Sequence, residues 1–168
     1  MSEHEANPTD AERLGHRYAG AIYGTILSLS VVAVSAGGDV RPGVLAVGVV
    51  VTSVVFWLAH AYAEAAGRQI AQKRRFRFAD RAQIAREEWP MVQSSLPIAA
   101  CLVVGQLGLL GDQRPTWLAM VVGIAILAGW GFAVGRAEGL HGVQRIVSVL
   151  TTAAFGIVLL VLKILVSH

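Results

Sequence analysis

Residues 42–63 have the sequence PGVLAVGVVVTSVVFWLAHAYA, and none of these 22 positions is Asp, Glu, Lys or Arg. A helix needs about 20 apolar residues to cross about 30 Å of hydrocarbon, because each residue adds about 1.5 Å along the axis. So apolar a helix has no polar face left for water. The stretch therefore predicts a membrane-spanning helix.

Four further stretches without Asp, Glu, Lys or Arg occur in the chain. They lie between Arg17 and Asp39, Glu88 and Asp112, Arg114 and Arg136, and Arg145 and Lys163. Only 15% of all residues are charged, whereas soluble domains carry about 25%. We therefore expect an all-α membrane protein, a bundle of about five transmembrane helices. The spans are expected at about 18–37, 43–65, 90–110, 116–135 and 146–166, in a single transmembrane domain (14–168) that follows a disordered polar tail (1–13).

The distribution of basic residues predicts the orientation. If the N-terminus is inside, 11 Lys and Arg residues lie on the cytoplasmic side and 3 lie outside. Basic residues near the ends of spanning helices are retained in the cytoplasm. The sequence therefore predicts a cytoplasmic N-terminus and an external C-terminus. The use of 12 Arg against 2 Lys, with abundant Ala, Gly and Val, favours the plasma membrane of a bacterium with a GC-rich genome.

Residues 68–89 form a basic cytoplasmic linker with a pattern of its own. One helical stripe carries apolar side chains, at Ala71, Phe78, Ala82, Ala85 and Trp89. This pattern predicts an amphipathic helix on the cytoplasmic leaflet with its charges facing anionic lipid. The alternative is a solvated loop whose charge only fixes the topology. The residues expected to contact lipid headgroups are Arg68, Lys73, Arg74, Arg75, Arg77 and Arg81. Nucleic-acid binding is not expected, since the patch adjoins a membrane and shows no recognisable fold for that purpose.

The most distinctive polar residues close the second span. His60 and Glu64 are four residues apart and so share a helix face. The predicted topology places three further titratable residues, His16, Glu138 and His141, on the same membrane face. Imidazole and carboxylate groups together can relay protons or bind a divalent metal. The five residues form a candidate ion or proton site, with no specific metal or cofactor motif. The alternatives are interfacial side chains without a ligand, or contact with lipid headgroups.

Small and hydroxyl-bearing residues lie within the spans. The spacings Gly20-x-x-x-Gly24 and Gly131-x-x-x-Gly135 predict close helix packing, either inside the bundle or between the subunits of a homo-oligomer. Hydroxyl groups in the spans either line a hydrated path or bond back to their own helices. Pro97 predicts a kink in the third span.

Three functional classes remain after the absent motifs are considered. The sequence contains no G-x-x-x-x-G-K-[ST], H-E-x-x-H, C-x-x-C or G-x-S-x-G motif. The leading hypothesis is an oligomeric ion channel or small-solute permeation protein with the His/Glu cluster at its cytoplasmic mouth. Its rival is a non-catalytic scaffold or accessory subunit that binds partners or lipid through the basic helix. A membrane enzyme acting on lipid headgroups ranks last, because no nucleophile–base pair is present.

Overall fold

The computed structural model describes residues 10–35, 40–72, 78–108 and 115–166, and every regular element in these ranges is an α-helix. The helices are α1 Asp10–Val34, α2 Pro42–Gln72, α3 Phe78–Glu87, α4 Pro90–Gln93, α5 Leu96–Gln106, α6 Pro115–Ala137 and α7 Val143–Val166. Four segments are long and apolar enough to cross a membrane: Leu14–Val34, Pro42–Ala71, Pro115–Ala137 and Val143–Leu165. The chain is thus an all-α protein with the helices of a multi-pass membrane protein.

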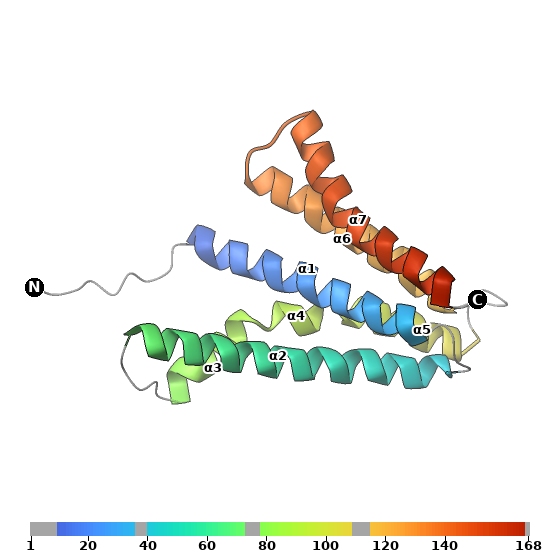
Figure 1. Ribbon diagram of the computed structural model, residues 1–168, viewed down its shortest axis with the longest axis horizontal. Helices are drawn as coiled ribbons and strands as arrows, with labels where there is room; N and C mark the ends of the chain where they lie inside the picture. Colours follow the sequence, from blue (N-terminus) through green and yellow to red (C-terminus); the bar gives the residue numbers. More distant parts are fainter. Residues whose placement is uncertain (1–9, 36–39, 73–77, 109–114, 167–168) are drawn as a thin grey trace, which may run out of the picture.

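The helices form a bundle with α1 in the middle (Figure 1). On one side of α1 lie α2 and the broken rod formed by α3, α4 and α5. On the other side lies the α6–α7 hairpin, which diverges from α1 toward the end where α1 begins (Figure 1). The first residues of α1 and the last residues of α7 lie at opposite ends. We call the end where α1 begins the basic end, because it carries Arg17, Arg68, Arg81, Arg136 and Arg145.

The predicted third span, residues 90–110, is not one helix. It is divided into α4 and α5 at Ser94 and Ser95, and the apolar helix α5 has only 11 residues. Pro90 and Pro97 each lie in the first turn of their helix, where the missing N–H does no harm. Both serines keep right-handed helical backbone angles, so the break removes helical hydrogen bonds without reversing the chain. The sequence predicted a kink at Pro97, and the structure has a full interruption just before it.

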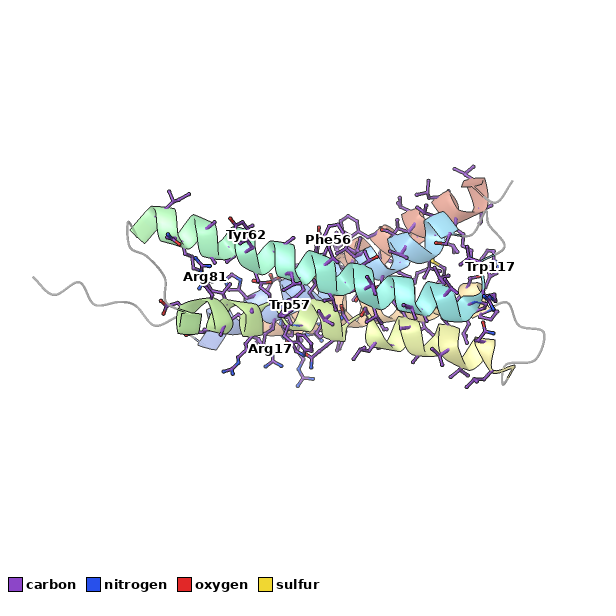
Figure 2. All side chains as sticks on the ribbon, turned by 90° about the horizontal axis from the view of Figure 1, so that it is seen from below. Arg17, Phe56, Trp57, Tyr62, Arg81 and Trp117 are labelled. Carbon is purple, nitrogen blue, oxygen red and sulfur yellow. The ribbon has the colours of Figure 1, made fainter. Side chains whose placement is uncertain are left out.

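The rod formed by α3, α4 and α5 runs antiparallel to α2, as Figure 2 shows. The backbone N–H of Gly43 donates to Oε1 of Gln106 at one end, and the indole N–H of Trp57 donates to the carbonyl of Ala85 nearer the other. One buried stripe continues through both breaks at helical spacing. It consists of Ile84, Glu88, Met91, Ser95, Ile98 and Leu102. The three short helices therefore present a common face to the bundle.

The basic linker contains a helix, but its bounds and its buried face differ from the prediction. The first part of the linker, up to Gln72, belongs to α2, and α3 then covers only Phe78–Glu87. Ile84 of α3 is buried, whereas Trp89, predicted on the apolar stripe, is 43% exposed. The inward stripe is thus one position away from the predicted one. Helix α1 begins at Asp10, inside the tail predicted for residues 1–13. Residues 1–9 lie outside the described part of the chain.

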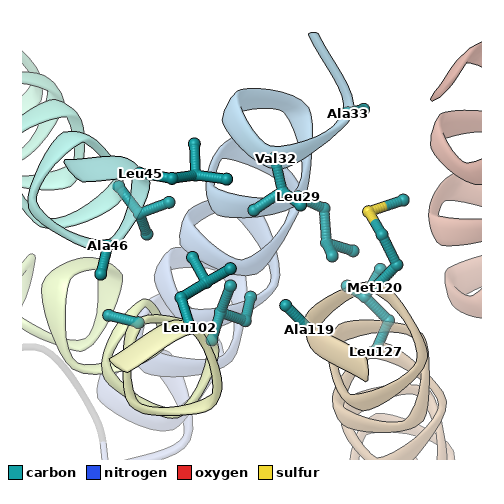
Figure 3. Packing of buried hydrophobic residues seen from close by; sticks show 12 residues of the cluster. Leu29, Val32, Ala33, Leu45, Ala46, Leu102, Ala119, Met120 and Leu127 are labelled. Carbon is teal, nitrogen blue, oxygen red and sulfur yellow. The ribbon is translucent and has the colours of Figure 1, made fainter. Parts of the chain in front are cut away.

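The apolar core lies away from the basic end. It joins α1, α2, α5 and α6 through twelve buried side chains (Figure 3): Leu29, Val32, Ala33, Leu45, Ala46, Val49, Ile98, Ala99, Leu102, Ala119, Met120 and Leu127. Full burial of a Leu or Met side chain contributes about 1.5–3 kcal/mol in water. Inside a bilayer the same contacts act through close packing instead, because lipid is equally apolar. The core therefore fixes one half of the bundle, and polar groups gather in the other half.

Both predicted glycine faces are used within the chain. A Cβ atom on Gly24 would overlap the carbonyl oxygen of Met91 and the hydroxyl of Ser94, so this glycine lets α1 lie directly against α4. A Cβ atom on Gly131 would overlap the hydroxyl of Thr152, so α6 approaches α7 in the same way. These glycines are internal packing positions, as the spacing predicted.

Candidate functional site

Glu88 is the buried carboxylate of the basic end. It follows α3 directly, on the inward stripe one turn after Ile84, and its side chain is only 7% exposed. The stripe turns it toward α1 and α2 rather than toward the surface. A buried carboxylate is costly unless a partner compensates its charge, so its surroundings decide what it can do.

The partner of Glu88 is His60 of α2. Nε2 of His60 lies 3.5 Å from Oε2 of Glu88, and the His60 side chain is 51% exposed. The ring centroids of His60 and Tyr23 are 6.4 Å apart, which adds an aromatic side chain of α1 to the site. Among the described residues, His60 provides the only ion pair of Glu88. This pair therefore joins a half-exposed imidazole to a buried carboxylate.

A small residue of α1 makes room for the pair. A Cβ atom on Gly20 would lie 3.9 Å from Oε2 of Glu88 and 3.7 Å from the backbone nitrogen of Met91. Next to these groups is a cavity of about 430 Å³, whose lining includes His16, Gly20, Tyr23, His60 and Glu88. The cavity gives water-sized species access to the buried carboxylate.

Two further carboxylates, Glu64 and Glu87, form a separate cluster around Arg68, one turn farther along α2 than His60. Nε of Arg68 donates to Oε1 of Glu64 at 2.8 Å, and Nη2 of Arg68 lies 3.4 Å from Oε2 of Glu87. Gln83 also donates to Glu87, at 3.1 Å. The guanidinium group thus compensates both carboxylates, and this cluster ties α2 to α3.

Tryptophan side chains lie beside the Glu88 site. The rings of Trp57 and Trp89 meet edge to face with centroids 5.3 Å apart, and Trp57 also donates a 2.7 Å hydrogen bond to the Ala85 carbonyl. Tryptophan is enriched where a membrane protein passes from hydrocarbon to headgroups. This pair therefore marks the level of the Glu88 site as close to the membrane interface.

The five predicted site residues separate into three groups. His16 and His60 line the same cavity, and Glu64 is instead engaged by Arg68. Glu138 and His141 are exposed in the connection between α6 and α7 and do not line this cavity. Glu88 was not predicted, because residues 68–89 were assigned as a whole to a surface linker.

The residues expected to contact lipid headgroups also differ from one another. Arg68 is engaged by Glu64 and Glu87. Arg81 is exposed and lines a small hollow of about 230 Å³ against α2. Lys73, Arg74, Arg75 and Arg77 lie outside the described residues.

Hydroxyl groups in the spans bond to helix carbonyls. Thr25, Ser28 and Ser53 are buried, and each donates to the carbonyl four residues earlier, at 2.8–2.9 Å. Ser148 donates across to the Gly131 carbonyl at 2.9 Å. These hydroxyls thus serve packing, as one of the two alternatives predicted.

In the part of the chain that the structure describes, no three His, Cys, Asp or Glu side chains lie close enough together to bind a metal ion. Two side chains can share a proton, whereas protein metal sites usually need three or more ligands. The site around Glu88 therefore pairs one carboxylate with one imidazole.

Comparisons with protein-family models, with curated proteins and with solved structures find no match to this chain.

Proposed function

We propose that this protein is a small permeation protein of the plasma membrane that takes up protons at Glu88 and His60. The observation that carries the proposal is the position of Glu88, which is buried beside a cavity and compensated by an imidazole instead of a guanidinium or ammonium group. A buried carboxylate is costly unless a partner compensates its charge, and one retained beside a cavity is a candidate for a proton or ion pathway. Imidazole is suited to such a role because its charge changes near physiological pH.

The broken rod supports the same proposal. Discontinuous helices in membrane transporters expose backbone groups and commonly form substrate or ion sites. Here the turns at Glu88–Trp89 and at Ser94–Ser95 lie on the same rod, and the first of them contains Glu88 itself. A rod of three short helices can also shift more easily than one continuous helix. We propose that protonation of Glu88 changes its packing against α1 and α2.

The excess of basic residues supports a cytoplasmic location for the basic end. The proton site would then open to the cytoplasm, with the C-terminus outside. Homo-oligomerisation is part of this proposal, since one bundle of this size has little interior for a pore. The glycine faces are already used within the chain, so the subunits would meet through exposed apolar side chains. On α7 these include Ile146, Leu150, Phe155 and Val158.

Reconstitution into liposomes tests the proposal. We expect vesicles that contain the protein and an entrapped pH-sensitive dye to take up protons under a potassium diffusion potential, faster than protein-free vesicles. Glu88→Gln should reduce the rate to that of protein-free vesicles, because the amide cannot bind the proton. Glu138→Gln is the matched control, since Glu138 is an exposed carboxylate outside the cavity. No flux with the wild-type chain, or equal flux with Glu88→Gln, would contradict the proposal.

One observation favours a second candidate, a non-conducting accessory subunit. The hydroxyls of Thr25, Ser28 and Ser53 are satisfied within their own helices, so they offer no polar path between the two ends of the bundle. An accessory subunit would use the basic end to hold a partner or lipid. The same assay separates the two candidates, because an accessory subunit alone gives no flux.

A further inference from the structure

A third hollow lies between α1, α6 and the α4–α5 region. The α6–α7 hairpin diverges from α1 toward the basic end (Figure 1). The hollow is a groove of about 570 Å³, and its lining includes Arg17, Tyr18, Ala21, Gly129 and Trp130. Ligand sites in proteins commonly measure about 300–1,000 Å³ and are largely apolar. The groove is thus large enough for part of an amphiphilic molecule.

Small side chains create this space. Ala21 of α1 and Gly129 of α6 both lie in the lining, and a Cβ atom on Gly129 would meet nothing within 4 Å. Gly123 differs, because its absent side chain is needed for contact with Leu29. Gly129 therefore leaves open volume on the face of α6 that lines the groove.

The groove has a charged residue at one end and apolar residues beyond it. Arg17 is exposed and immediately precedes the charge-free stretch of α1, so it lies where hydrocarbon gives way to headgroups. An arginine at this position can hold a phosphate oxygen with two N–H donors. Farther in, the lining is mainly apolar and includes Pro97 and Ile126. This order of a cation followed by apolar surface matches a phospholipid, which has an anionic headgroup and acyl chains.

Trp130 adds an aromatic side chain to the lining. Its ring packs against Tyr18 with centroids 5.6 Å apart, and its indole Nε1 is shielded from solvent without an acceptor among the described residues. Buried indole N–H groups usually have a partner. The Tyr18–Trp130 pair therefore gives the groove an aromatic wall next to Arg17.

We propose that this groove binds one anionic phospholipid of the leaflet at the basic end, with the phosphate on Arg17 and an acyl chain along Ala21 and Gly129. This site is separate from the Glu88 cavity and does not depend on the function proposed above. It is also separate from the basic linker, for which lipid contact was expected from the sequence.

Native mass spectrometry of the full chain in mild detergent tests this proposal, with phosphatidylglycerol and phosphatidylcholine of identical acyl chains as probes. We expect one phosphatidylglycerol to be retained about tenfold more tightly than phosphatidylcholine, because the choline ammonium of phosphatidylcholine already compensates the phosphate charge and weakens its pairing with Arg17. Arg17→Gln should remove this preference. Arg136→Gln is the matched control, because Arg136 is exposed at the same end of the bundle and does not line the groove.

Gly129→Leu tests the position of the acyl chain. The leucine side chain fits into open space and should fill the groove, so that neither lipid is retained. Gly48→Leu is the control, since Gly48 also lies in a spanning helix, has nothing within 4 Å of its Cβ position, and is outside the groove. Both substitutions raise helix propensity. Equal retention of the two lipids by the wild-type chain, or undiminished retention by Gly129→Leu, would overturn the proposal.

Discussion

Two polar sites involve α2 residues one turn apart, His60 and Glu64, and their carboxylates have different surroundings. In one, Arg68 compensates Glu64 and Glu87, and its own side chain is 33% exposed. In the other, Glu88 is buried and faces His60 beside a cavity. A guanidinium group stays charged at every physiological pH, whereas an imidazole can gain or lose its proton. The comparison teaches that the first cluster joins helices through two ion pairs, while the second sets a buried carboxylate and an imidazole beside a cavity.

The largest expected effect comes from breaking the close contact between α1 and α4, which begins two residues after Glu88. Gly24→Leu would drive a side chain into the Met91 carbonyl and the Ser94 hydroxyl, separating α1 from α4. We expect the free energy of unfolding to fall by about 3 kcal/mol or more, at the upper end of what overpacking costs. Denaturant unfolding in detergent measures this loss. Gly48→Leu should unfold like the wild-type chain, and similar unfolding of the two variants would show that α1 does not approach α4 closely.

A smaller effect is expected from the compensated cluster. Arg68→Gln removes both ion pairs of this cluster, but the groups are partly exposed and therefore screened. We expect the free energy of unfolding to fall by about 0.5–1 kcal/mol. Proton flux per folded protein should remain unchanged in the liposome assay. A loss of flux as large as that of Glu88→Gln would mean that the two clusters act as one site.

The sequence predicted most of the spanning helices, because long charge-free stretches have few alternatives to crossing a membrane. It failed at the third span, where Pro90, Pro97 and two serines divide the stretch into α4 and α5. The proline signal indicated a kink, but backbone hydrogen bonding decides whether a kink becomes an interruption. Glycine spacing correctly predicted close packing and could not identify the partner helix, which depends on the whole bundle.

The candidate site was predicted only in part. His16 and His60 lie together, as the shared membrane face suggested. Glu88 was missed because it lies 28 positions after His60, and their contact requires α2 and the broken rod to run antiparallel. A signal was nevertheless present, since Ile84, Glu88 and Met91 continue the stripe of Ile98 and Leu102 at helical spacing. The apparent stripe ending at Trp89 obscured it.

Infrared difference spectroscopy of the reconstituted protein tests the central claim most directly, because it observes the protonated carboxyl group itself. We predict that lowering the pH produces a carbonyl stretching band from a protonated carboxyl group shielded from water. This band should be absent in Glu88→Gln and present in Glu87→Gln, in which the carboxylate beside Arg68 is removed instead. A band that persists in Glu88→Gln, or that disappears only in Glu87→Gln, would contradict the assignment of Glu88 as the proton-binding group.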